Sequence, residues 1–154
     1  MYIVSKCLLG ENCKYNGANN LSEDVVQFCK SHTFTSVCPE TCGGLKAPRD
    51  PAEIVRSEDG FFRVIDASGK DLTENFLSGA EKELENSIRT AEKMGESVEG
   101  AILKANSPSC GAGKVYDGSF SRTLVEGDGI FAGRLRELGI EIANENNLRE
   151  IFTK

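Results

Sequence analysis

Short apolar runs and longer amphipathic stretches alternate along the chain, and their order predicts strands separated by helices. β-Branched and aromatic residues gather at 2–4 and 33–37, and a further apolar run occupies 100–104. Runs of this composition, bounded by loops that contain Gly or Pro, are typical of buried strands. Ile140-Glu141-Ile142 predicts a last strand near the end of the chain.

Helical periodicity is clearest between residues 73 and 95. Apolar residues recur there at steps of three and four, with Asp71 or Thr73 as the expected cap and Gly95 as the expected stop. The apolar positions are Phe76, Leu77, Ala80, Leu84, Ile88, Ala91 and Met94. This pattern predicts one long helix with a single buried face.

Weaker signals complete the set of elements. Helices are predicted at about 23–31 and 130–138, and a short one from about Asn147. Asp-Gly pairs predict two β-hairpins, one over 54–65 and a second over 114–120. The dense Gly and Pro content of the stretch from Cys38 to Pro51 predicts an ordered loop.

Strands that alternate with helices imply right-handed crossovers and parallel pairing. The sequence therefore predicts an α/β fold with a mostly parallel, Rossmann-like sheet, helices on both faces, and one or two β-hairpins. The length of 154 residues suits one domain with a real core. We expect residues 1–154 to form a single compact domain.

Composition narrows the range of functions. The net charge of −6 argues against a general nucleic-acid-binding surface. No apolar run approaches the length that crosses a membrane, and the N-terminus lacks the features of a signal peptide. We therefore expect a cytoplasmic protein that does not bind membranes and has no general nucleic-acid-binding surface. In a reducing compartment, its six cysteines are more often buried, catalytic or metal-bound than paired in disulfides.

Three cysteines occupy equivalent places in the predicted fold. Cys7, Cys38 and Cys110 each follow a predicted strand and stand in loops punctuated by Gly or Pro. The carboxyl ends of parallel strands meet at one edge of a sheet, and ligands bind there. We therefore expect the three thiols to converge on a common site.

The other cysteines carry different signals. Cys29 lies on the apolar face of a predicted helix and is expected in the core. Cys13 and Cys42 are each close in sequence to one of the three loop thiols, and either could be a spare thiol or bind a further metal. The chain contains no C-x-x-C, which argues against thioredoxin-like and zinc-ribbon sites.

Polar residues beside these cysteines are candidates for catalysis and binding. Glu40, two residues after Cys38, is either a general base or a solvated acid. Ser107 and Ser109 could cap a turn or donate hydrogen bonds to a substrate. Arg49, between two prolines, could bind an anionic or carbonyl group or form a structural ion pair.

Several short motifs, spread over nearly the whole chain, together resemble those of one protein family. The motifs are Cys7-Leu-Leu-Gly10, Lys14-Tyr-Asn-Gly17, Cys38-Pro-Glu40, Gly43-Gly-Leu45, Pro48-Arg49, Pro51-Ala-Glu53, Ser107-Pro-Ser-Cys-Gly111 and Tyr116-Asp-Gly118. Together they resemble the small bacterial and archaeal family, long known as a domain of unknown function, that includes the 4Fe–4S thiouracil desulfidases (TudS). The chain carries Lys14 and Asn16 where that family more often has Arg and Asp, which bears on the choice of substrate.

The resemblance implies a cofactor and a reaction. It implies a 4Fe–4S cluster held by only three cysteines, Cys7, Cys38 and Cys110, with one iron left open. That iron would take up a thiocarbonyl sulfur, Glu40 would activate a water, and Ser107 would hydrogen-bond the ring or relay a proton. The expected reaction is a non-redox, hydrolytic desulfidation of a thiolated pyrimidine such as thiouracil, as the free base or a nucleoside.

Two further residues are candidates for substrate binding, and two alternative functions are compatible with the sequence. Ser109 and Arg49 are expected to bind the substrate. One alternative is a non-catalytic module with zinc held by the three loop cysteines and by Cys42 as a candidate fourth ligand. The other is a thiol-based redox enzyme that uses Cys38 and Cys42.

Overall fold

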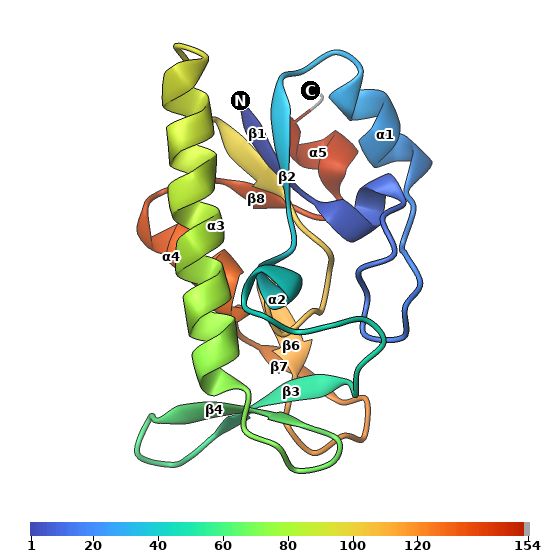
Figure 1. Ribbon diagram of the computed structural model, residues 1–154, viewed down its shortest axis with the longest axis vertical. Coiled ribbons are helices and arrows are strands. Elements are labelled where there is room, and N and C mark those ends of the chain that lie inside the picture. The colour runs from blue at the N-terminus through green and yellow to red at the C-terminus, as the bar shows by residue number, and fades with distance from the viewer. Residues whose placement is uncertain (153–154) are drawn as a thin grey trace.

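A parallel four-stranded sheet forms the centre of the computed structural model, which describes residues 1–152 (Figure 1). The strands lie in the order β2-β1-β5-β8, and each neighbouring pair is parallel. Their bounds are Tyr2–Ser5 for β1, Phe34–Val37 for β2, Gly100–Ile102 for β5 and Ile142–Ala143 for β8. The predicted α/β class and the parallel sheet are confirmed.

Helices cover both faces of this sheet, as predicted. Figure 1 shows α3 and α4 on one side and α1 and α5 on the other. Their bounds are Thr73–Lys93 for α3, Ile130–Glu137 for α4, Glu23–Cys29 for α1 and Leu148–Phe152 for α5. Successive strand residues point to opposite faces, so Ile3 packs with α3 and α4 while Val4 packs with α1 and α5.

Two antiparallel hairpins stand apart from the sheet, at the lower end of the view in Figure 1. The first joins β3 (Ala52–Arg56) to β4 (Phe62–Asp66) and agrees with the prediction. The second joins β6 (Lys114–Tyr116) to β7 (Leu124–Glu126). The prediction of a hairpin within 114–120 was therefore wrong about the returning strand, because a wide loop precedes it.

The stretch predicted as a loop after β2 contains a short helix. It is α2, Pro39–Cys42, and Cys38 is its N-cap. Proline suits the first helical position, since its fixed φ fits the helix and the first turn needs no N–H from it. A 3₁₀ turn, η1 (Lys6–Leu9), follows β1 in the same way. Two of the three predicted metal-binding cysteines thus sit on helical turns rather than on irregular loops.

Element ends differ from the predictions in two further places. The last strand is displaced from 140–142 to 142–143, because the Ile140 N–H donates to the carbonyl of Leu135 at the end of α4. The N-cap of α3 is Leu72 rather than Asp71 or Thr73, although an Asp71 carboxylate oxygen accepts the Thr73 N–H at 2.9 Å.

The strand order places a crevice at the centre of the sheet. From β1 the chain crosses to β2 on one side and later returns to β5 on the other side. The connections therefore diverge beyond the carboxyl ends of β1 and β5, where such sheets bind ligands. Within residues 1–152, no helix is long and apolar enough to cross a membrane.

Candidate functional site

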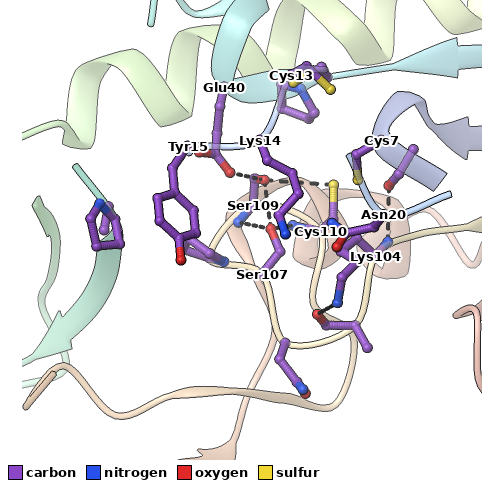
Figure 2. Close-up of a pocket in the computed structure, with 18 of the residues that line it drawn as sticks. Cys7, Cys13, Lys14, Tyr15, Asn20, Glu40, Lys104, Ser107, Ser109 and Cys110 are labelled. Atoms are coloured by element: carbon purple, nitrogen blue, oxygen red, sulfur yellow. Dashed lines mark hydrogen bonds between the residues drawn. The ribbon is translucent and has the colours of Figure 1, made fainter. Parts of the chain in front are cut away.

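A cavity of about 420 Å³ lies between the carboxyl edge of the sheet and the two hairpins (Figure 2). Residues that follow β1, β2 and β5 line one part of it. Residues 51–53 at the start of β3, together with Tyr116, Phe120 and Arg122 from the second hairpin, line the rest.

The structure places the three predicted cysteines in this cavity. Cys7 lies on η1 and is half-buried, while Cys38 and Cys110 are buried. Their strands, β1, β2 and β5, are neighbours in the sheet, so the loops that carry them leave the same edge side by side. The thiols are close enough for the charge of Cys38 to oppose ionisation of Cys7, and for the charges of Cys7 and Cys38 to oppose ionisation of Cys110. All three are free thiols.

Cys13 is a fourth thiol in the cavity. Its side chain hydrogen-bonds the thiols of both Cys7 and Cys38. Contact with Cys13 lowers the pKa of Cys38 to about 6, against the opposing effect of burial. The same contact lowers the pKa of Cys7, and it raises the pKa of Cys13 itself, which is the hydrogen-bond donor.

Cys42, the other ambiguous cysteine, does not line the cavity. Burial raises its pKa, and its thiol hydrogen-bonds Glu83 of α3. Cys38 does have the low pKa that a redox thiol needs, but the thiol that lowers it is Cys13, not Cys42. The geometry thus gives no support to a Cys38–Cys42 redox pair.

The loop that carries Cys110 is held by α4. The first backbone N–H groups of this helix donate to the loop, from Ile130 to the carbonyl of Pro108 and from Phe131 to the carbonyl of Ser109, both at 2.9 Å. Gly129 permits this contact, because a Cβ there would lie 2.6 Å from the Ser109 carbonyl carbon. Burial raises the pKa of Cys110 well above the ordinary range of a thiol.

Glu40 and Arg49 form an ion pair at the cavity wall. Glu40 Oε1 accepts from Arg49 Nη2 at 2.9 Å and from Nε at 3.3 Å, and both side chains are mostly buried. Arg49 Nη2 also donates to the Cys13 carbonyl at 3.0 Å. One guanidinium therefore fixes both the candidate base and the backbone of the fourth thiol.

Two serines connect Glu40 to the Cys110 loop, as Figure 2 shows. Ser109 Oγ lies 2.8 Å from Glu40 Oε2 and 3.0 Å from Ser107 Oγ. A hydroxyl has only one proton to donate. Ser109 donates it to the nearby Glu40 carboxylate rather than to the Cys110 sulfur, which is 3.7 Å away. The Ser107 hydroxyl is then the donor to Ser109, so the hydrogen bonds run from Ser107 through Ser109 to Glu40.

Ser107 also caps the turn, one of the two roles expected for it. Its Oγ accepts the N–H of Ser109 at 3.2 Å and that of Cys110 at 3.1 Å. Because these bonds use only its lone pairs, its proton stays available to the chain toward Glu40. The capping role and the donor role are compatible in this geometry.

Two positioning residues escaped the sequence analysis. Glu83 on α3 accepts the Cys38 N–H at 2.7 Å and is 8 % exposed. Its position on the buried face of α3, next to Leu84, was the available signal, since a carboxylate there needs a partner. Glu53, also 8 % exposed, belongs to a quoted motif but was given no role. It accepts two backbone N–H groups of the second hairpin.

The donor set suits an iron–sulfur cluster better than a single zinc ion. Within residues 1–152, no group of three or more His, Cys, Asp or Glu side chains is arranged to hold one metal ion. Instead, three thiols from separate loops border a cavity with room for a larger group. Thiolates are the usual ligands of iron–sulfur clusters. Cys42, the candidate fourth zinc ligand, lies outside the cavity lining.

Comparisons with known proteins agree along almost the full chain. The sequence model of the 2-thiouracil desulfurase family matches residues 2–147. The uncharacterized protein YbbK of Bacillus subtilis (strain 168) is 39% identical over 157 residues, covering 99% of this chain and 100% of that protein. Among solved structures, the [4Fe-4S]-dependent thiouracil desulfidase TudS is similar, with a TM-score of 0.80 and 36% identity over 97% of this chain and 93% of that one.

Proposed function

The chain belongs to the 2-thiouracil desulfurase family, and from this membership and the cavity geometry we propose that it replaces the sulfur of a thiolated pyrimidine with oxygen. The similar TudS structure is that of a [4Fe-4S]-dependent thiouracil desulfidase. The proposed substrate is 2-thiouracil or a close relative, and the products are the oxo base and sulfide.

The observation that carries the proposal is the meeting of three thiols and one anchored carboxylate at a single cavity. Cys7, Cys38 and Cys110 are the residues that would hold the cluster. When bound by only these three cysteines, a 4Fe–4S cluster supplies an open iron, a soft Lewis acid for the thiocarbonyl sulfur. Glu40 borders the same cavity, within reach of a substrate held there.

Glu40 is the proposed general base. Arg49 holds one of its oxygens and Ser109 the other, so the carboxylate has a fixed direction. Arg49 uses both lone pairs of Oε1, whereas Oε2 accepts only from Ser109 and keeps a lone pair that can take a proton from water. The activated water attacks the carbon that carries sulfur. Positioned acid–base groups of this kind contribute about 10²–10⁴-fold to rates.

The two serines complete the proton balance. Once Glu40 has taken a proton, the hydroxyl protons of the two serines can reverse, so that Glu40 donates to Ser109, Ser109 to Ser107 and Ser107 to the substrate, which returns the proton. One water is consumed, the C=S bond becomes C=O, and hydrogen sulfide leaves, so no electrons are gained or lost. Arg49 acts here through Glu40 rather than through the substrate.

The first test measures cofactor and reaction on protein purified without oxygen. About four irons and four acid-labile sulfides per chain are expected, and 2-thiouracil should yield uracil and sulfide in equal amounts without a reductant. In water enriched in heavy oxygen, the uracil should carry the label. A fully loaded protein that releases no sulfide from 2-thiouracil would contradict the proposed function, and unlabelled uracil would contradict the hydrolytic step.

Substitution of Glu40 tests its role in catalysis separately from cluster binding. Glu40→Gln should retain the cluster, because no thiol is removed, and should lower kcat by about 10²–10⁴-fold. Iron content and the visible absorbance of the cluster provide the check on loading. Normal turnover by the loaded variant would remove Glu40 from the mechanism.

A further inference from the structure

The loop between β6 and β7, residues 117–123, forms part of the cavity wall and contains two residues in an unfavourable conformation. Phe120 and Arg122 both line the cavity, and both have positive φ, 59° and 61°. The left-handed region is costly for residues with a Cβ, and it persists only where the surroundings enforce it. Neither residue takes part in the chemistry assigned to Glu40 and the thiols.

Hydrogen bonds among Asp117, Ser119, Ser121 and Thr123 hold this loop internally, and the buried carboxylate of Glu53 on β3 ties it to the first hairpin. Its Oε1 accepts the N–H of Gly118 at 3.0 Å and that of Phe120 at 3.1 Å. Gly118 permits the close approach to β3, because a Cβ there would lie 2.8 Å from the carbonyl oxygen of Ile54, and its φ is 93°. The loop is therefore held at its base by a carboxylate that is itself 8 % exposed.

This arrangement presents an apolar ring to the cavity. Phe120 lines the cavity, and 39 % of its surface is exposed. Tyr15 and Tyr116 are the other aromatic residues in the lining, and each carries a hydroxyl. Phe120 offers only its faces and edges, which favour contact with another planar ring.

We propose that Phe120 packs against the ring of the substrate and selects cyclic thiocarbonyl compounds over acyclic ones, and that Glu53 is the positioning residue that holds Phe120 there. The inference rests on the proposed desulfidase function and assigns the specificity of the same site. The ligand class is a planar heteroaromatic ring that carries C=S. Glu53 acts through the loop in this proposal, since its Oε1 accepts two backbone N–H groups of that loop.

The first test uses cluster-loaded enzyme and 2-thiouracil. Phe120→Ala should raise KM about tenfold and change kcat less than about twofold, because base–aromatic stacking is lost while the chemistry is retained. Phe120→Tyr keeps the ring and should restore KM. Phe61→Ala is the matched control: this phenylalanine is 74 % exposed, lies between β3 and β4, and does not line the cavity.

The second test addresses Glu53. Glu53→Ala should raise KM to the same extent as Phe120→Ala. The double variant should have the same KM as either single variant, since both changes remove the same contact between Phe120 and the substrate. Glu53→Gln retains an oxygen that can accept both N–H groups and should stay within about threefold of wild type. Amide exchange at Gly118 and Phe120 should become at least tenfold faster in Glu53→Ala, independently of turnover.

Binding by calorimetry separates this inference from the proposed function. In the loaded Glu40→Gln background, in which turnover is slow, Phe120→Ala should weaken binding of 2-thiouracil about tenfold and leave unchanged the binding of thiourea, which carries C=S without a ring. Equal loss for both compounds, or unchanged KM in Phe120→Ala, would overturn the role of Phe120. Additive effects of the two substitutions would overturn that of Glu53. A protein that binds 2-thiouracil in this pattern but releases no sulfide would refute the desulfidase proposal alone.

Discussion

Cys13 gives the cavity a thiol that the three-cysteine pattern does not require. It contacts two of the three proposed ligands, and its backbone is held by the arginine that also holds Glu40. Cluster assembly needs thiolates, and the thiolate is the reactive form of cysteine. A hydrogen-bond donor placed between Cys7 and Cys38 therefore favours the forms that accept iron.

The thiolate of Cys38 can be titrated in cluster-free protein. Its pKa of about 6 means that the ultraviolet absorbance of the thiolate is fully developed at pH 8 and is lost as the pH falls through 6. Removal of the donor in Cys13→Ala should move that midpoint toward the ordinary thiol value of about 8.5. Cys42→Ala is the control, because Cys42 lies outside the cavity and should leave the curve unchanged. An unchanged midpoint in Cys13→Ala would contradict the assigned contact.

At the scale of elements, the contact between α2 and α3 decides where Glu40 and Cys38 lie. The two helices touch through backbone atoms. A Cβ at Gly79 would lie 1.9 Å from the Pro39 carbonyl oxygen, and one at Gly43 would lie 2.1 Å from the Asn75 carbonyl oxygen. Only glycine fits at either position, so the short helix that carries Glu40 lies directly against the backbone of α3.

Gly79→Ala should therefore harm both stability and activity. Overpacking of this kind costs about 1–3 kcal/mol, and the displaced α2 should lower kcat for 2-thiouracil. Gly133→Ala in α4 is the matched control, because its Cβ would meet nothing closer than 3.7 Å and alanine favours a helix by up to about 1 kcal/mol. Urea unfolding and kinetics provide the measurements. Equal stability of the two variants would argue against the helix contact.

The elements show where sequence reasoning succeeds and where it stops. The long helix was predictable because its apolar positions repeat over many turns, and the sheet because short apolar runs alternate with helices. The helix α2 was missed, since four residues are too few for periodicity to show. The wide loop after Tyr116 was missed because its path depends on Glu53, which lies 65 residues from Gly118 in the sequence. The convergence of three thiols followed from topology, whereas the contacts of Cys13 and Glu83 depend on side-chain packing that no local pattern records.

At the scale of the whole molecule, the proposed cluster would tie together loops that leave three neighbouring strands. A group that binds only the folded state stabilises it. Cluster-loaded protein should therefore unfold at a temperature about 5 °C or more above that of the cluster-free form. Cys110→Ser should unfold like the cluster-free form under both conditions, whereas Cys29→Ser should retain the difference. Coincident thermal transitions of loaded and cluster-free wild type would argue against a cluster shared among these loops.

The strand order β2-β1-β5-β8 also sets a sequence of events during synthesis. The first candidate ligand, on η1, leaves the ribosome about a hundred residues before the last one, which at ~5–20 residues per second is a delay of roughly 5–20 s. The central strand β1 can pair with β2 early in synthesis, but its other neighbour, β5, is synthesised much later. A nascent chain consequently presents two of the proposed ligands before the third exists, and the proposed cluster can be completed only after residue 110 has been translated.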